Sequence, residues 1–367
     1  MLTPSNLKKL IREPAQAALG LVSRGSEEIL NLRIKSAISR GYVPAVLPYT
    51  GYGTVDRVRV LGRVLLVNPR PSWWGKSTNV RGWRSFTSLP IADATVRVTI
   101  EGKSFDVQAD DGGVVDAVLD ANLEPGWHTV SMQVQMGEFG MSESAEAQVR
   151  IVNPEKQLGI ISDIDDTVMV TALPRPMLAA WNTFVLDEHA RMPTPGMSVL
   201  MERLTAAHQD APVIYLSTGA WNVAPTLRRF LTRNLYPAGP LLLTDWGPTR
   251  ERWFRSGKEH KRSNLRRIAE DFPHFTWILI GDDGQADETI YAEFAREFPD
   301  KVAAICIREL SVGEAVLAGG RSPHRLSRTT PGVPWAYAPD GAGLVAQLEQ
   351  LGLLPESAKV PQSEERL

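Results

Sequence analysis

The stretch Ile160-Ile161-Ser162-Asp163-Ile164-Asp165-Asp166-Thr167-Val168 decides how the rest of the chain is organised. The apolar run from Leu158 predicts a buried strand of a parallel sheet, and three carboxylates follow within four residues. Crowded carboxylates repel one another unless a divalent cation or a shared proton relieves the repulsion. Because open α/β sheets bind ligands beyond the carboxyl ends of their strands, we expect a metal-dependent reaction centre here.

The alternative interpretation is an acidic turn in which Asp166 or Thr167 caps the next helix. An Asp-x-Asp-x-Thr pattern arises by chance in about one chain in twenty of this length, so the motif does not decide by itself. The polar residues that end the other strands must distinguish a metal-dependent reaction centre from a capping turn.

Strand and helix patterns alternate after Asn153-Pro154, as far as about residue 350. The expected strands lie at residues 213–217, 241–243, 277–280 and 302–307. The expected helices lie at residues 199–207, 226–235, 260–271, 289–297 and 342–353. Repeated strand–helix units predict a parallel, doubly wound α/β sheet.

Polar groups gather where these elements begin or end. They are Ser217 and Thr218 after one strand, Lys258 and Lys261 before or at the start of the helix expected near His260, and Asp282, Asp283 and Asp287 after another strand. Each group has an alternative interpretation as a cap or a turn. Taken together, two acidic clusters, a hydroxyl and a lysine at element ends predict a magnesium and phosphoryl site.

These segments resemble the four motifs of the haloacid-dehalogenase (HAD) superfamily. Residues 163–167 match its Asp-x-Asp-x-Thr motif, Ser217 its hydroxyl, Lys261 its lysine, and Asp282 with Asp283 and Asp287 its last acidic motif. More narrowly, residues 163–167, 215–218, 260–261 and 280–287 with Tyr291 are similar to the actin-patch-protein type of magnesium-dependent phosphatidate phosphatase, a relative of the lipins. Residues 51–54 and 62–65 resemble the segment that precedes this domain in bacterial members. The resemblance covers about residues 45–310. Asp283 departs from it, because the family usually has serine there.

The resemblance implies a HAD-like phosphatase domain at residues 154–353 that hydrolyses phosphomonoesters, with phosphatidate as the expected substrate and diacylglycerol as the product. Asp163 would attack phosphorus to form an aspartyl phosphate, and Asp165 would serve as the acid and then the base. Ser217 and Lys261 would hold the phosphoryl oxygens, with Lys258 as the fallback lysine. Thr167 and Thr218 complete the predicted phosphate site.

The implied cofactor is Mg²⁺, held by Asp163, the backbone carbonyl of Asp165 and Asp282. Asp283 and Asp287 would support these ligands or replace them. Residues 170–195 would form a small cap over the site, or pack on the core instead. Two further functions stay open: a phosphatase for a soluble phosphoester, and a noncatalytic module that contacts membranes or proteins.

The N-terminal part has different patterns. Residues 1–48 have apolar residues at roughly helical spacing among basic ones, which predicts a helical segment that lies on a membrane or packs on its own domain. Residues 49–153 alternate apolar with polar residues between Gly and Asp turns, which predicts a small antiparallel β-sandwich. The charged tail at residues 354–367 is expected to be disordered.

A tryptophan-rich loop lies inside the predicted sandwich, at residues 68–86. It combines Trp73, Trp74 and Trp83 with four cations, two of which are Arg81 and Arg84. Amphipathic rings next to cations suit the headgroup region of an anionic membrane, although the tryptophans could instead cover the sheet. Single-stranded nucleic acid would also suit such a loop, but the phosphatase motifs favour a lipid, so we expect no nucleic-acid partner.

Composition limits the class of protein. Residues 1–90 hold 14 Lys/Arg and 4 Asp/Glu, a net of +10, which leaves 26 minus 38, or −12, for the rest of the chain. This asymmetry suggests a basic lobe for an anionic partner beside an acidic lobe for a metal. No secretory signal or run of eighteen apolar residues is seen, and the single Cys306 excludes an intrachain disulfide. We expect a cytoplasmic protein, peripheral to the inner face of the membrane if its substrate is a lipid.

Overall fold

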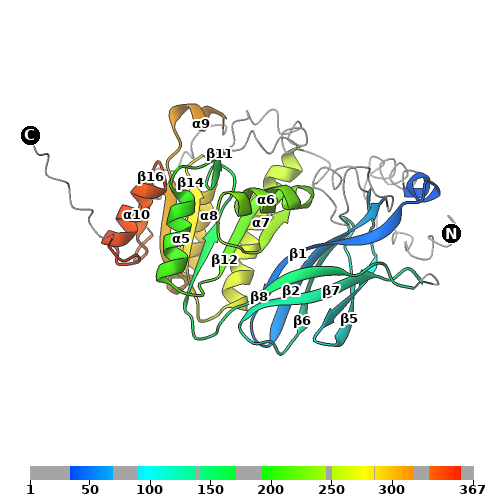
Figure 1. The fold of residues 1–367 in the computed structure, drawn as a ribbon. Helices are drawn as coiled ribbons and strands as arrows, with labels where there is room; N and C mark the ends of the chain where they lie inside the picture. The colour runs from blue at the N-terminus through cyan, green and yellow to red at the C-terminus, as the bar shows by residue number, and fades with distance from the viewer. Residues whose placement is uncertain are drawn as a thin grey trace, which may run out of the picture.

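The computed structural model describes residues 34–68, 89–137, 140–170, 192–244, 250–284, 286–317 and 330–356. Within these residues the chain forms a mostly antiparallel sheet followed by a parallel sheet with helices, and Figure 1 shows the two side by side. None of the described helices combines the length and apolar character needed to cross a membrane.

The first sheet has eight strands in the order β3-β2-β1-β8-β7-β4-β5, with β6 paired to β2. The strands are β1 (Val43–Gly53), β2 (Arg57–Val67), β3 (Leu89–Pro90), β4 (Thr95–Ile100), β5 (Lys103–Gln108), β6 (Val114–Asp120), β7 (Gly126–Val134) and β8 (Ala145–Ile151). Alternating residues such as Val96, Val98 and Val130 are fully buried in its own core. Hydrogen bonds join all the strands into one sheet where we expected a sandwich, and β1 pairs with β8 in parallel. Alternation marks the buried face of a strand but not the neighbour with which it pairs.

The second sheet is parallel throughout and has the order β13-β12-β9-β14-β15-β16. Its strands are β9 (Leu158–Ser162), β12 (Val213–Ala220), β13 (Leu241–Thr244), β14 (Thr276–Asp282), β15 (Val302–Arg308) and β16 (Trp335–Ala338). Numbered along the chain, this order is 3-2-1-4-5-6, so its direction reverses between β9 and β14. Ligands of doubly wound sheets bind at such a reversal. Asp163 directly follows β9 and Asp282 ends β14.

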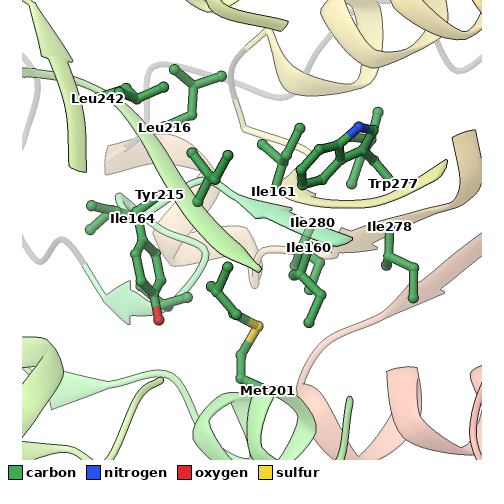
Figure 2. Packing of buried hydrophobic residues seen from close by; sticks show 14 of the residues in the cluster. Ile160, Ile161, Ile164, Met201, Tyr215, Leu216, Leu242, Trp277, Ile278 and Ile280 are labelled. Atoms are coloured by element: carbon green, nitrogen blue, oxygen red, sulfur yellow. The ribbon is translucent and has the colours of Figure 1, made fainter. Parts of the chain in front are cut away.

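Helices lie on both faces of this sheet. They are α5 (Met197–Ala207), α6 (Ala224–Arg233), α7 (Arg250–Asp271), α8 (Asp287–Glu297), α9 (Val312–Leu317) and α10 (Gly341–Gln350). Figure 2 shows Met201 of α5 pointing to the face that carries Ile160, while Trp277 lies on the opposite face. The side chain of Tyr291 in α8 lies against Gly281 on the Trp277 face. The predicted parallel sheet with alternating helices is therefore confirmed.

The expected start of the helix near His260 is wrong, because α7 begins at Arg250. Lys258 and Lys261 therefore lie inside the helix and not at its positive end. Gly257 in the preceding polar stretch resembles a helix boundary in the sequence, but a Cβ at this position would lie 3.0 Å from the Thr218 side chain. This glycine therefore permits close packing between α7 and the end of β12.

Four predicted segments fall wholly or mainly outside the described residues. They are the N-terminal helical segment up to residue 33, the tryptophan-rich loop with Trp73, Trp74, Trp83, Arg81 and Arg84, the cap at residues 171–191, and the tail from residue 357. Residues 34–39 are helical, but residues 43–48, which the predicted helical segment includes, belong to strand β1. The other assignments remain predictions, as do the domain boundaries.

Candidate active site

The turn after β9 is held by several backbone hydrogen bonds. The Asp163 amide donates to the carbonyl of Ile280 in β14 at 2.9 Å, which joins the two strand ends. The carbonyl of Ile164 accepts hydrogen bonds from the amides of residues 167, 168 and 169. Asp166 adopts a left-handed conformation with φ of 61°, which aspartate tolerates better than most residues. The motif therefore forms a tight turn that begins with Asp163.

Two residues from other elements fix this turn. Arg308, the last residue of β15, donates from Nη1 to the carbonyl of Asp166 at 2.7 Å and from Nη2 to Glu314 Oε1 at 2.6 Å. The hydroxyl of Tyr236 donates to the carbonyl of Val168 at 2.7 Å. Sequence reasoning missed both residues, although the position of Arg308 at the end of an apolar run is a signal that could have identified it.

Three buried carboxylates come together where the strand order reverses. Asp163, Asp282 and Asp287 each offer an oxygen within 4.8 Å of the others, and each side chain is almost completely withdrawn from water. Lys261 Nζ contacts Asp163 Oδ1 at 2.7 Å and Asp287 Oδ1 at 2.6 Å. The structure thus brings together four residues that the sequence placed in one site.

The charges in this cluster do not balance. If all three carboxyl groups are ionised, they carry three negative charges against the one positive charge of Lys261. Burial raises the pKa of Asp163 well above its usual range; Lys261 opposes this rise, while Asp287 and Asp165 add to it. Burial and the neighbouring carboxylates Asp287 and Asp163 likewise raise the pKa of Asp282. Burial alone would lower the pKa of Lys261, but Asp163 and Asp287 outweigh it and raise that pKa, so the lysine stays charged. The cluster therefore needs protons or a further cation.

The oxygen donors fit a hard divalent cation. Asp287 Oδ2 is buried and makes no hydrogen bond within the part of the chain that the structure describes, so this oxygen is available to a metal. Gly281 makes room for this carboxylate, since a Cβ there would lie 2.7 Å from Asp287 Oδ2. Three carboxylates without nitrogen or sulfur ligands suit Mg²⁺ or Mn²⁺ better than a soft metal.

The hydroxyl of Ser217 lies at the same edge of the sheet. It donates to Asp165 Oδ2 at 2.8 Å and accepts a hydrogen bond from the Gly219 amide at 2.9 Å. The Thr167 hydroxyl is buried and has no hydrogen-bond partner among the described residues. The backbone carbonyl of Thr218 accepts from Thr244 Oγ1. Of these groups, the Ser217 hydroxyl contacts Asp165, the carboxylate predicted to move the proton.

Two predicted site residues lie apart from the cluster. Lys258 is exposed on α7, so Lys261 is the lysine that reaches the carboxylates. Asp283 Oδ1 accepts a hydrogen bond from the Leu310 amide at 2.9 Å, and Asp283 is not one of the three clustered carboxylates. Asp287 lies in the cluster instead, although we predicted only a supporting or alternative role for it.

A comparison with protein families bears on exactly this part of the chain. Residues 158–309 match the family described as "Phosphatidate phosphatase APP1, catalytic domain". The matched segment runs from the start of β9 to just past β15 and contains every residue of the cluster. The family resemblance predicted from the sequence is therefore confirmed for this segment.

Two curated proteins are similar to part of this chain. An uncharacterized protein of Schizosaccharomyces pombe is 30% identical over 154 residues, which are 42% of this chain and 25% of that protein. The phosphatidate phosphatase APP1 of Saccharomyces cerevisiae is 27% identical over 152 residues, which are 41% of this chain and 26% of that protein. The chain therefore matches about a quarter of the length of each relative.

Two solved structures show weak likenesses to this chain. A carbohydrate acetylesterase from Xanthomonas citri aligns with 76% of this chain and 73% of its own, at 11% identity and a TM-score of 0.25. A β-glucuronidase from Parabacteroides merdae aligns with 72% of this chain and 34% of its own, at 10% identity and a TM-score of 0.21. Scores this low carry no argument about fold or activity.

Proposed function

We propose that the chain is a Mg²⁺-dependent phosphatidate phosphatase with a HAD-type catalytic domain. The observation that carries the proposal is the buried cluster of Asp163, Asp282 and Asp287 around Lys261, inside the segment that matches the APP1 catalytic domain. A buried excess of negative charge is costly for a fold and is retained at sites that bind cations. The substrate class rests on the family and on the basic, tryptophan-rich N-terminal region.

In this proposal Asp163 is the nucleophile. A carboxylate oxygen of Asp163 forms a bond to phosphorus while the bond from phosphorus to the ester oxygen breaks. Asp165 gives a proton to the departing alcohol oxygen and later removes a proton from the water that attacks the aspartyl phosphate. The second step releases inorganic phosphate and regenerates the Asp163 carboxylate.

The neighbouring groups position the phosphoryl oxygens. The Lys261 ammonium already contacts Asp163, so a phosphoryl group transferred to Asp163 would lie within its reach. Ser217 can turn its hydroxyl from Asp165 toward a phosphoryl oxygen, because a hydroxyl rotates about a single bond. Asp163, Asp282 and Asp287 would hold Mg²⁺, which would neutralise negative charge on the phosphoryl group.

Turnover measurements on the purified full chain test the proposal. Phosphatidate in detergent micelles is compared with a panel of soluble phosphoesters, with Mg²⁺ and with excess chelator, and Asp163→Asn is the matched inactive control. We expect Mg²⁺-dependent release of phosphate from phosphatidate and little from the soluble panel. Faster turnover of a soluble ester would assign a soluble substrate, and no turnover of any phosphoester would favour an interaction module.

The proposed location follows from the proposed substrate. Phosphatidate lies in a membrane, so we propose a cytoplasmic enzyme that binds the inner membrane face through its basic N-terminal region. Cell fractionation with and without 0.5 M salt tests this location, because salt screens the attraction between surface charges and releases a peripheral protein.

A further inference from the structure

The first sheet packs directly on the part of the chain that forms the parallel sheet and its helices. Two tyrosines of β1 make this contact. A register shift in β1 between Tyr49 and Tyr52 allows both side chains to join the core of the parallel sheet. The Tyr49 ring stacks on Trp221 with centroids 4.7 Å apart, and the Tyr52 ring lies 5.7 Å from Phe272, just beyond the end of α7. The first sheet therefore contributes these two side chains to the core of the parallel sheet, in addition to forming its own core.

A buried arginine crosses this contact. Arg59 of β2 is only 5% exposed, and it binds Asp116 of β6 through two bonds of 2.7 and 2.6 Å. Its Nη1 also donates to the Tyr52 hydroxyl at 2.8 Å and to Asn264 Oδ1 of α7 at 3.3 Å. A guanidinium group with its donors directed in this way fixes the position of each partner more firmly than a lysine would.

Asn264 connects Arg59 to the helical turn that carries Lys261. The Asn264 side chain donates to the carbonyl of His260 at 2.9 Å, one residue before Lys261. His260 Nε2 lies 3.2 Å from the carbonyl of Leu242 in β13, which anchors the same turn to the sheet. The chain of contacts thus runs from the first sheet to the residue next to the site lysine.

We infer that Arg59, held by Asp116, and Asn264 are positioning residues for Lys261. They set the place of α7 along the sheet, and thereby the place of Lys261 Nζ relative to Asp163. Arg59 and Asp116 lie outside residues 158–309, so the matched segment does not contain everything that its lysine needs. This inference rests on the proposed function, in which Lys261 holds phosphoryl oxygens.

The test is a double-mutant cycle on phosphate binding, measured by calorimetry on the full chain with Mg²⁺ and inorganic phosphate. Asn264→Leu removes the side-chain oxygen that accepts a hydrogen bond from Arg59. Arg59→Lys keeps a positive charge beside Asp116 but removes the guanidinium group that makes several directed hydrogen bonds. Each change should weaken phosphate binding about tenfold in the wild-type background and less than about twofold in Lys261→Ala, because the two residues act through the lysine. The matched control is Arg97→Lys, which alters a two-bond pair with Asp106 on the exposed face of the same sheet and should change binding less than about twofold.

The outcomes separate the possibilities. Equal losses with and without Lys261 would mean that Arg59 and Asn264 only support the fold, and no loss in either variant would also overturn the inference. A wild-type chain that binds no phosphate would overturn both the inference and the proposed function. If the two variants depend on Lys261 in phosphate binding but the chain does not hydrolyse phosphatidate, only the proposed substrate would be wrong. Thermal unfolding of each variant identifies any that fails to fold, and the remaining variant then decides.

Discussion

The two sheets differ in how far the charges of their carboxylates are balanced by neighbouring cations. In the first sheet the carboxylates lie beside arginines, as Asp106 beside Arg97 on the surface and Asp116 beside both Arg59 and Arg267 near the contact with α7. At the carboxyl edge of the parallel sheet, three buried carboxylates lie together with one lysine, which contacts two of them. Balanced pairs serve the fold, whereas a buried excess of one sign indicates a missing partner of the other sign.

Asp163→Asn should abolish turnover, by about 10³-fold or more, because an amide does not attack phosphorus. Folding should survive, since removing one charge from the cluster relieves repulsion. The matched variant Asp106→Asn, on the first sheet, should stay within about twofold of wild-type turnover. Steady-state hydrolysis of phosphatidate micelles measures both variants. Near wild-type activity of Asp163→Asn would exclude the aspartyl-phosphate mechanism.

Asp282→Ala should raise the Mg²⁺ concentration needed for half-maximal activity by about tenfold or more, since one of three hard ligands is lost. Asp283→Asn should have a smaller effect, because the Asp283 carboxylate accepts a backbone amide and lies outside the cluster. Mg²⁺ titrations of activity after chelator treatment compare the two variants. Full activity of Asp282→Ala in chelator would remove this carboxylate from the metal site.

Acid should reduce the stability of the fold through His260. Burial lowers the pKa of this imidazole from its ordinary 6.5 to about 4. The folded chain favours the neutral His260 ring. Its contribution to the free energy of unfolding is therefore complete above pH 6.5 and is lost as the pH falls toward 4. Wild type should lose about 2–3 kcal/mol more than His260→Gln between pH 7 and 4.5. Urea unfolding at both pH values measures the difference. The raised pKa values of Asp163 and Asp282 act with the opposite sign in both chains and therefore cancel. Equal losses of unfolding free energy in wild type and His260→Gln would show that His260 does not cause the acid sensitivity.

Trp73→Ala with Trp74→Ala should weaken sedimentation with phosphatidate-containing vesicles by about tenfold, if these rings lie at headgroup depth. Hydrolysis of p-nitrophenyl phosphate should be spared, because that ester needs no membrane. High salt should weaken vesicle binding in the same way. Unchanged vesicle binding would return the loop to a structural role. Equal loss on both substrates would mean that the tryptophans hold the fold.

The sequence predicted the parallel sheet and most of its site. The run from Leu158 is continuously apolar because β9 lies between two strands and is buried on both faces, and such a run is visible without any knowledge of its neighbours. The acidic motifs follow strands directly, so parallel topology alone brings Asp163 and Asp282 to one edge. Local pattern and global topology agree there.

The missed features all depend on long-range contacts. Arg59 looks like any other polar residue in an alternating strand, and only the packing of α7 against the first sheet buries it. The start of α7 is not evident from the sequence because Gly257 in a charged stretch suggests a boundary, although in the structure this glycine packs closely against Thr218 inside the helix. The continuous first sheet was missed because apolar alternation does not specify which strands pair.

Detection of phosphate on Asp163 tests the central claim most directly. Asp165→Asn protein is mixed with ³²P-labelled p-nitrophenyl phosphate and Mg²⁺, quenched in acid and digested. Because p-nitrophenolate leaves without a proton donor, the label should still reach Asp163, while hydrolysis of the aspartyl phosphate slows without its base. We expect about one p-nitrophenolate per site to be released in a burst, with the label on the peptide that contains Asp163. Steady turnover without a burst and without label on that peptide would contradict the aspartyl-phosphate mechanism.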